Sequence, residues 1–206
     1  MTFPDSKFEN TGTFVDAYFD ELTKAAASVD RARITQAVEL MEQTHEAGGT
    51  VYACGNGGSA SISNHLACDH GKLLATDTGL TPHIHSLASN VEVITAIAND
   101  IDYSEVFVHQ LKLLAGPGDA LVTISSSGDS ENVVKAAAWA GENGLSVISM
   151  TGFEGGRTAG LAHVNLHVTA NNYGVIEDVH QSLMHLLGQF MRQKRMSADL
   201  ITQRKF

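Results

Sequence analysis

The stretch TVYACGNGGSAS, residues 50 to 61, joins a short apolar run to a run of glycines and serines. Residues 50–54 are apolar or β-branched without polar alternation, which predicts a buried strand of a parallel sheet. A tight turn needs one or two glycines, yet three glycines, an asparagine and two serines follow the strand. This excess of small residues predicts that a ligand lies close to the backbone here.

A second apolar run with a similar sequel lies at residues 119–125, where DALVTIS precedes SSGDS and a helical pattern that begins near Glu131. A helix N-terminus presents unpaired N–H groups and a partial positive charge, which both favour phosphate. Ser125, Ser127 and Ser130 add hydroxyl donors, and no lysine or arginine lies in the loop. The loop predicts a cradle for a sugar phosphate held by neutral donors. The alternative is an ordinary turn with a serine cap.

Neither loop has the sequence of a nucleotide site. A Walker-type loop ends in GK[ST], which both loops lack, and GNGGS does not have the G-x-G-x-x-G spacing of a dinucleotide site. We therefore expect no nucleotide cofactor.

Further strands are predicted on both sides of these runs, at residues 83–88, 146–152 and 163–170, with helical patterns between them. A long helix is predicted over residues 177–195. Because strands alternate with helices, the pattern predicts an α/β fold with a mainly parallel sheet covered on both faces. We expect a flavodoxin-like three-layer sandwich.

No linker divides the chain, so we expect one domain over residues 1–206. Within it, residues 50–206 form the α/β core, and residues 1–49 form an N-terminal helical hairpin. The hairpin has no sheet of its own to cover, which favours packing against another subunit. Alternatively, it covers one face of its own sheet.

Composition narrows the class of partner. The chain has 206 residues, 43% of them hydrophobic, and a formal net charge of −10, which argues against nucleic acid or an anionic membrane as the main partner. It contains no apolar run long enough to span a membrane and begins without a secretory signal. Cys54 and Cys68 form no disulfide framework and are predicted to be small buried residues. We expect a cytoplasmic protein.

Histidines and carboxylates occupy helical positions near both ends of the core. His65 and Asp69 are four residues apart, which places them on one helix face, and Glu177, His180 and His185 lie around the last helix. Two histidines and two carboxylates suit a metal such as zinc, or an acid–base pair. Spacing alone does not bring Asp69 and His185 together, and it leaves open whether His180 supports the site or is simply packed.

Together, GNGGSAS, the segment from His65 to Asp69, Ala98-Asn99-Asp100, ISSSGDSENV and the segment from Glu177 to His185 resemble the sugar isomerase (SIS) domain family. The chain is most similar to its phosphoheptose isomerases, over nearly the whole length. This resemblance implies an aldose–ketose isomerase that converts sedoheptulose 7-phosphate to D-glycero-D-manno-heptose 7-phosphate. It also implies a homotetramer with active sites at subunit interfaces.

The resemblance also implies roles for individual residues. The serine loop binds the phosphate, and two further segments contact the sugar. These positions are Ser125, Ser126, Ser127 and Ser130 for the phosphate, and Asn56, Gly57, Gly58, Ser59, Asn99 and Asp100 for the sugar. The family's zinc and catalytic set corresponds to His65, Asp69, Glu177 and His185.

Two members of this set depart from the family. Its glutamate is Asp69 here, one methylene shorter, and its glutamine is Glu177, which adds a negative charge. We hypothesise Asp69 as the base that moves the carbon-bound proton and His185 as the acid. His65 and Glu177 then act as metal ligands or orienting groups, and Asp69 and Glu177 also contact substrate.

Two alternatives remain open. The scaffold could isomerise another phosphosugar, as the departures at Asp69 and Glu177 suggest. It could also be a non-catalytic SIS scaffold that binds the replication initiator. A sugar-sensing transcription factor would carry a basic DNA-binding module, which the first 50 residues do not resemble.

Overall fold

The computed structural model describes residues 2–206. Its centre is a five-stranded parallel sheet with the strand order β2-β1-β3-β4-β5. This order is that of the flavodoxin-like fold, so the expected class is confirmed. The strands are β1 (Thr50–Cys54), β2 (His83–Ser86), β3 (Ala120–Ser125), β4 (Ser146–Thr151) and β5 (Val164–His167).

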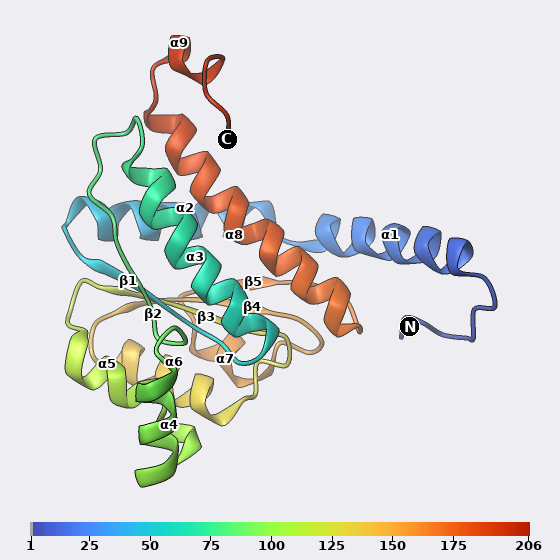
Figure 1. Cartoon of the computed structure of the whole chain (residues 1–206), viewed down its shortest axis with the longest axis horizontal. Coiled ribbons are helices and arrows are strands. Elements are labelled where there is room, and N and C mark those ends of the chain that lie inside the picture. Colours follow the sequence, from blue (N-terminus) through green and yellow to red (C-terminus); the bar gives the residue numbers. More distant parts are fainter. Residues whose placement is uncertain (1) are drawn as a thin grey trace.

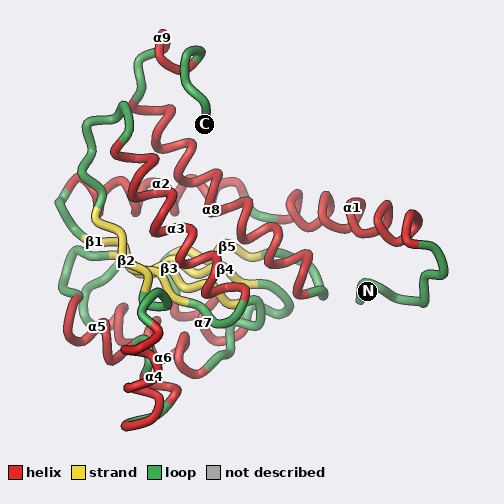
Figure 2. The backbone as a smooth tube through the Cα atoms, in the orientation of Figure 1, coloured by secondary structure: helices red, strands yellow, loops and turns green. Residues whose placement is uncertain are grey.

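Helices cover both faces of the sheet (Figure 1), and Figure 2 shows the yellow strands between two layers of red helices. One layer contains α2, α3 and α8, and the other contains α4, α5 and α6. No helix in residues 2–206 is long and apolar enough to cross a membrane. The helices are α1 (Thr11–Ser28), α2 (Arg31–Glu46), α3 (Gly58–Ala75), α4 (Val91–Asp100), η1 (Tyr103–Glu105), α5 (Val108–Leu114), α6 (Glu131–Glu142), α7 (Gly156–Leu161), α8 (Tyr173–Arg195) and α9 (Ala198–Ile201).

The alternating directions of strand side chains divide the core into two clusters. In β1, Val51 and Ala53 join the cluster beneath α2, α3 and α8, whereas Tyr52 and Cys54 join the cluster on the other face. Both sets are buried, because helices cover both faces of the sheet. This two-sided burial explains why the strands appear in the sequence as continuous apolar runs.

The N-terminal helices do not form the expected hairpin. Figure 1 shows α1 continuing into α2 in nearly one line, and α1 contacts α8 while α2 lies on the sheet and α8. The turn between them is short, and the Asp30 side chain caps α2 by accepting a hydrogen bond from the Ala32 N–H. Helix α1 leaves Phe19 59% exposed.

Two other local features differ from expectation. Cys54 is buried in β1, but Cys68 is exposed on α3, so the prediction that both cysteines are buried was wrong for Cys68. The helix α7 (Gly156–Leu161) was not predicted. It spans six residues, three of them glycine or alanine, and is too short for an apolar period to mark it in the sequence.

Candidate active site

The two small-residue loops lie side by side at the carboxyl edge of the sheet. Strands β1 and β3 are neighbours, and the chain leaves them in opposite directions, towards β2 and β4. Loops at such a reversal point form the usual ligand crevice of an open parallel sheet. Here they line a pocket of about 190 Å³, together with the start of α8. We call it the serine pocket, and its lining residues are Asn56, Ser59, Ile124, Ser125, Ser126, Ser127, Ser130, Tyr173 and Glu177.

Two serines of this pocket have hydroxyl groups available for a ligand. The Ser126 hydroxyl is buried and has no hydrogen-bond partner in the described chain. Ser130 is the N-cap residue of α6, yet its side chain makes no capping hydrogen bond. The Ser125 hydroxyl differs, because it accepts from the Gly128 N–H within the loop. A buried hydroxyl without a partner is costly, so the Ser126 site suits an oxygen-rich group such as phosphate.

Backbone conformation and close packing explain why glycines occupy the GNGGS stretch. Gly57 has φ of +56°, a region that L side chains rarely adopt. A Cβ at Gly55 would overlap the Ile124 carbonyl and the Ser59 backbone, and a Cβ at Gly58 would overlap the Glu177 carboxylate. Much of the glycine excess therefore lets α3 approach β3 and α8. The pocket lies next to this close contact.

Asn56 ties the two loops together. Its amide exchanges two hydrogen bonds of 2.9 Å with the amide of Asn132, which is buried at the start of α6. The Tyr103 hydroxyl donates to the same Asn56 oxygen at 2.8 Å. Sequence reasoning missed both partners, although Asn132 directly follows the serine loop. With its amide engaged, Asn56 is held at the pocket wall in a fixed orientation.

The structure does not bring Asn99 and Asp100 into the serine pocket. Both are exposed at the end of α4, and the contact described for them joins the Asn99 amide to the Asp100 carboxylate at 2.8 Å. Neither residue lines the pocket.

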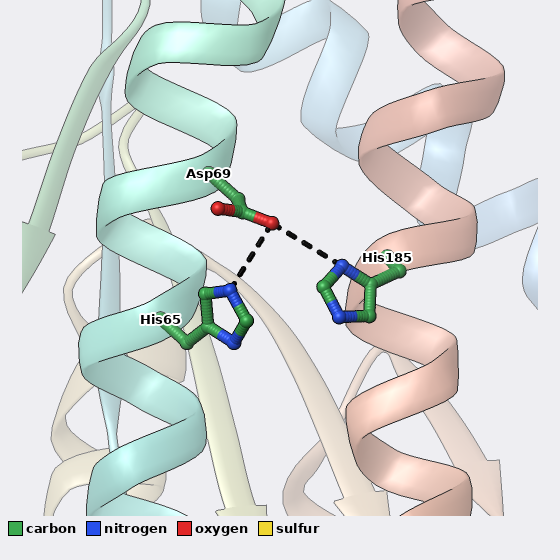
Figure 3. Close-up of side chains that lie close together, drawn as sticks. All are labelled: His65, Asp69 and His185. Carbon is green, nitrogen blue, oxygen red and sulfur yellow. Dashed lines mark ion pairs between the residues drawn. The ribbon is translucent and has the colours of Figure 1, made fainter. Parts of the chain in front are cut away.

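Helices α3 and α8 bring His65, Asp69 and His185 together (Figure 3). Asp69 Oδ2 lies 3.3 Å from His65 Nε2 and 3.2 Å from His185 Nδ1. The helices pack against each other, with Leu66 and Leu183 buried in the core and the three polar side chains more exposed. We call the three residues the His–Asp–His cluster. It places one carboxylate between two imidazoles.

Gln181 completes the cluster on the side away from Asp69. Its side-chain nitrogen lies 2.9 Å from His65 Nδ1 and 3.0 Å from His185 Nε2. Sequence reasoning missed this residue. The signal was present, because Glu177, Gln181 and His185 are spaced by four and therefore share one face of α8.

Glu177 lies outside the cluster. It borders the serine pocket and packs against Gly58 at the start of α3. Burial, and next the negative charge of Asp178, raise the pKa of the Glu177 carboxyl above its usual value. Of the four residues expected to act together, the structure gathers His65, Asp69 and His185, and it directs Glu177 to the neighbouring pocket.

His180 points away from the cluster into the core. It is fully buried, and its Nε2 lies 3.2 Å from the Thr151 carbonyl oxygen. Desolvation lowers the pKa of His180 to about 4, so the ring is neutral at physiological pH. Its environment is that of a packed structural histidine.

The His–Asp–His cluster is a group of side chains that could hold a metal ion. Among residues 2–206, it is the one group of three or more His, Cys, Asp and Glu side chains whose ligand atoms all lie within 4.8 Å of one another. Tetrahedral zinc, with bonds of about 2.0–2.2 Å, holds neighbouring ligand atoms about 3.3–3.6 Å apart. The two contacts of Asp69, at 3.3 and 3.2 Å, are close to this spacing.

Comparison with known proteins identifies the family of the chain. A family model described as SIS domain matches residues 16–152. The phosphoheptose isomerase of Shewanella piezotolerans is 38% identical over 157 residues, which are 75% of this chain and 79% of the relative. The solved phosphoheptose isomerase of Neisseria gonorrhoeae has a TM-score of 0.80 and 33% identity, covering 89% of this chain and 100% of that one. The solved phosphoheptose isomerase of Francisella tularensis has a TM-score of 0.80 and 29% identity, covering 89% of this chain and 99% of that one. The chain therefore belongs to the SIS domain family, in the branch that contains the phosphoheptose isomerases.

Proposed function

We propose that the protein is an aldose–ketose isomerase that converts sedoheptulose 7-phosphate to D-glycero-D-manno-heptose 7-phosphate. The observation that carries the proposal is the Asp69 carboxylate held between two imidazoles, on the helix that begins at the serine pocket, where the Ser126 hydroxyl has no partner in the described chain. The similarity to phosphoheptose isomerases supports the choice of a seven-carbon substrate. This sugar has a phosphate at one end and a carbonyl group at the other, so its conversion requires a phosphate-binding pocket and a separate acid–base site.

The reaction moves a carbonyl group between C1 and C2. In our proposal, Asp69 removes the proton from the hydroxyl-bearing carbon and returns it to the neighbouring carbon. His185 donates a proton to an enediol oxygen and accepts one back through Nε2, which exchanges its contact with Gln181 for the substrate. Positioned acids and bases of this kind contribute about 10²–10⁴-fold to a rate. Both contacts of Asp69 to the imidazoles use Oδ2, which leaves Oδ1 to face the substrate.

We further propose that the cluster holds zinc through His65, Asp69 and His185. Bound there, zinc would supply a Lewis acid that polarises the substrate carbonyl. Glu177, which we expected as a fourth ligand, lies at the serine pocket and is better suited to accept hydrogen bonds from sugar hydroxyls. The remaining sugar contacts are assigned to Asn56 and the first turn of α3.

For the phosphate we propose Ser126 and Ser130 as direct donors, together with the N–H groups of Ser125–Ser127. The free hydroxyls and the N-terminus of α6 support this assignment. Two acidic residues beside this site, Asp129 and Glu131, are paired with Arg157, at 2.9 Å each, which offsets their charge.

We propose that the protein is a cytoplasmic homotetramer. The apolar side chains left exposed on α1 and α8, including Phe19, Leu186 and Phe190, support burial between subunits. An interface site would also account for Asn99 and Asp100, which lie away from the pocket of their own chain and would reach that of a neighbour.

The test is turnover of sedoheptulose 7-phosphate by purified protein, depleted of metal and then reloaded with zinc, followed by NMR of the aldose product. Zinc-dependent turnover supports the isomerase and the metal site together. Turnover without zinc supports the isomerase proposal and contradicts the proposal that the reaction needs zinc. Tight binding without turnover favours another phosphosugar as substrate, and the absence of both favours a scaffold, for which binding to the replication initiator is then measured.

A further inference from the structure

Gln181 contacts both histidines of the cluster, although neither the sequence nor the family resemblance gave it a role. We propose that Gln181 is a positioning residue whose side-chain amide sets the tautomer and ring orientation of His65 and His185 at the same time. The proposal deepens the proposed active site and rests on it. The experiment below separates the failure of one from the failure of the other.

The four side chains form a closed ring of polar contacts. Asp69 faces the inner nitrogen of each imidazole, at 3.3 and 3.2 Å. Gln181 faces the outer nitrogens, at 2.9 and 3.0 Å. Each imidazole is therefore held at both of its nitrogens, and the two rings meet edge to face with centroids 4.9 Å apart. A ring fixed at both nitrogens cannot turn about its side-chain bond without breaking a contact.

The chemistry of an amide imposes the same proton arrangement on both rings. Its NH₂ group offers two donors, and its oxygen offers two lone pairs. When the nitrogen faces the rings, as here, both outer nitrogens accept, so the proton of each neutral imidazole is on the inner nitrogen and points towards Asp69. When the amide turns over, its oxygen accepts from both outer N–H groups. Both inner nitrogens then present lone pairs on the side of Asp69.

The second arrangement is the one that a cation requires. Histidine binds a metal through a neutral, unprotonated nitrogen, and the hydrogen bond of its other nitrogen decides which one is free. One turn of a single amide therefore converts the cluster from a proton-bearing to a metal-ready form. A carboxylate at position 181 could accept from both rings but could not donate to them, so only an amide serves both forms.

The exposure of the rings explains why this support matters. The His65 and His185 side chains are 43% and 37% exposed, so packing alone does not immobilise them. Loss of an outer partner of a ligating histidine typically costs 10–100-fold in metal affinity or activity. Gln181 serves two ligands, so its removal affects both at once.

The experiment compares Gln181→Leu, Gln181→Glu and a control, Gln189→Leu, two turns further along α8. The first measurement is the ¹⁵N chemical shifts of the ring nitrogens in the metal-free protein, which report the tautomer of each ring directly. We expect one defined tautomer for each ring in the wild type and the control. In Gln181→Leu we expect averaged shifts for both rings.

The second measurement is the zinc dissociation constant, by competition with a chromophoric chelator. We expect Gln181→Leu to weaken zinc binding about 10–100-fold. Gln181→Glu should retain the affinity, because its carboxylate accepts from both outer N–H groups, and Gln189→Leu should leave it unchanged. Binding of phosphosugar to the serine pocket should be equal in all four proteins.

Defined tautomers and unchanged zinc affinity in Gln181→Leu would overturn the proposal. So would averaged tautomers in the wild type. If the wild type isomerises no phosphosugar, the proposed function fails, yet the ring-nitrogen shifts of the metal-free proteins still decide the role of Gln181.

Discussion

The carboxylate of Asp69 on α3 lies 3.2 Å from Nδ1 of His185 on α8, so the two groups that we assign as base and acid are in direct contact. Their helices flank the same face of the sheet, and buried leucines join them.

Removing either member of this contact should stop isomerisation. We expect Asp69→Asn and His185→Ala to lower kcat by about 10²–10⁴-fold, because each deletes a positioned proton-transfer group. Steady-state kinetics with sedoheptulose 7-phosphate provide the measurement. Cys68→Ser, at an exposed neighbour of Asp69 on α3, is the matched control and should retain the wild-type rate. An Asp69→Asn variant with normal kcat would refute the assignment of Asp69 as the base.

Removing the unpaired hydroxyl of the serine pocket should weaken substrate binding more than it slows chemistry. A hydrogen bond to a charged group contributes about 1.5–3 kcal/mol, so Ser126→Ala should raise the Kd of the phosphosugar about 10–100-fold. Calorimetric titration with the phosphosugar measures the change. The Ser126→Ala variant should be as stable as the wild type or slightly more stable, because the buried hydroxyl has no partner in the described chain. Equal affinity for wild type and variant would place the phosphate elsewhere.

The turn of the serine loop should tolerate only glycine at position 128. Gly128 has φ of +67°, and a Cβ there would overlap the Gly155 carbonyl, which is rigid backbone. Gly128→Ala should therefore lower the free energy of unfolding by more than about 1 kcal/mol. Gly141→Ala, in the helix α6 with open space around it, should instead raise it by about 0.5–1 kcal/mol. Denaturant unfolding distinguishes the two, and an equal effect in both variants would contradict the argument.

Buried His180 should make the protein sensitive to acid. Its folded pKa is about 4, below the ordinary value of 6.5, so the unfolded state binds the proton more readily. Stability is therefore fully present above about pH 6.5 and is lost as the pH falls through 4, by about 3 kcal/mol in all. His180→Gln, which cannot be protonated, should show a shallower decline over this range. The measurement is the slope of unfolding free energy against pH, and an unchanged slope would exclude His180 as its source.

The class of fold was predictable because a doubly covered parallel sheet leaves a plain pattern in the sequence. Residues 50–54 and 120–125 are continuous apolar runs, and each is followed by small residues and a helix. The loop positions also identified the ligand edge, since the carboxyl ends of parallel strands share one edge. The arrangement of the helices in residues 1–49, which we expected to be a hairpin, was not predictable in the same way, because the direction of α1 depends on contacts with α8 and not on its own periodicity.

The sequence by itself determined which chemical groups the site has: a histidine and an aspartate one turn apart on α3, a histidine on α8, and serines at a helix start. These follow from local periodicity, which is short-ranged and visible in one segment at a time. Only the tertiary structure decided that Asp69 meets His185, that Glu177 turns to the serine pocket, and that Gln181 joins both rings. Each of these is a contact between helices distant in the chain, set by the packing of α3 against α8. The relative rotation of two packed helices depends on the core that they share, so the sequence of one helix alone does not determine it.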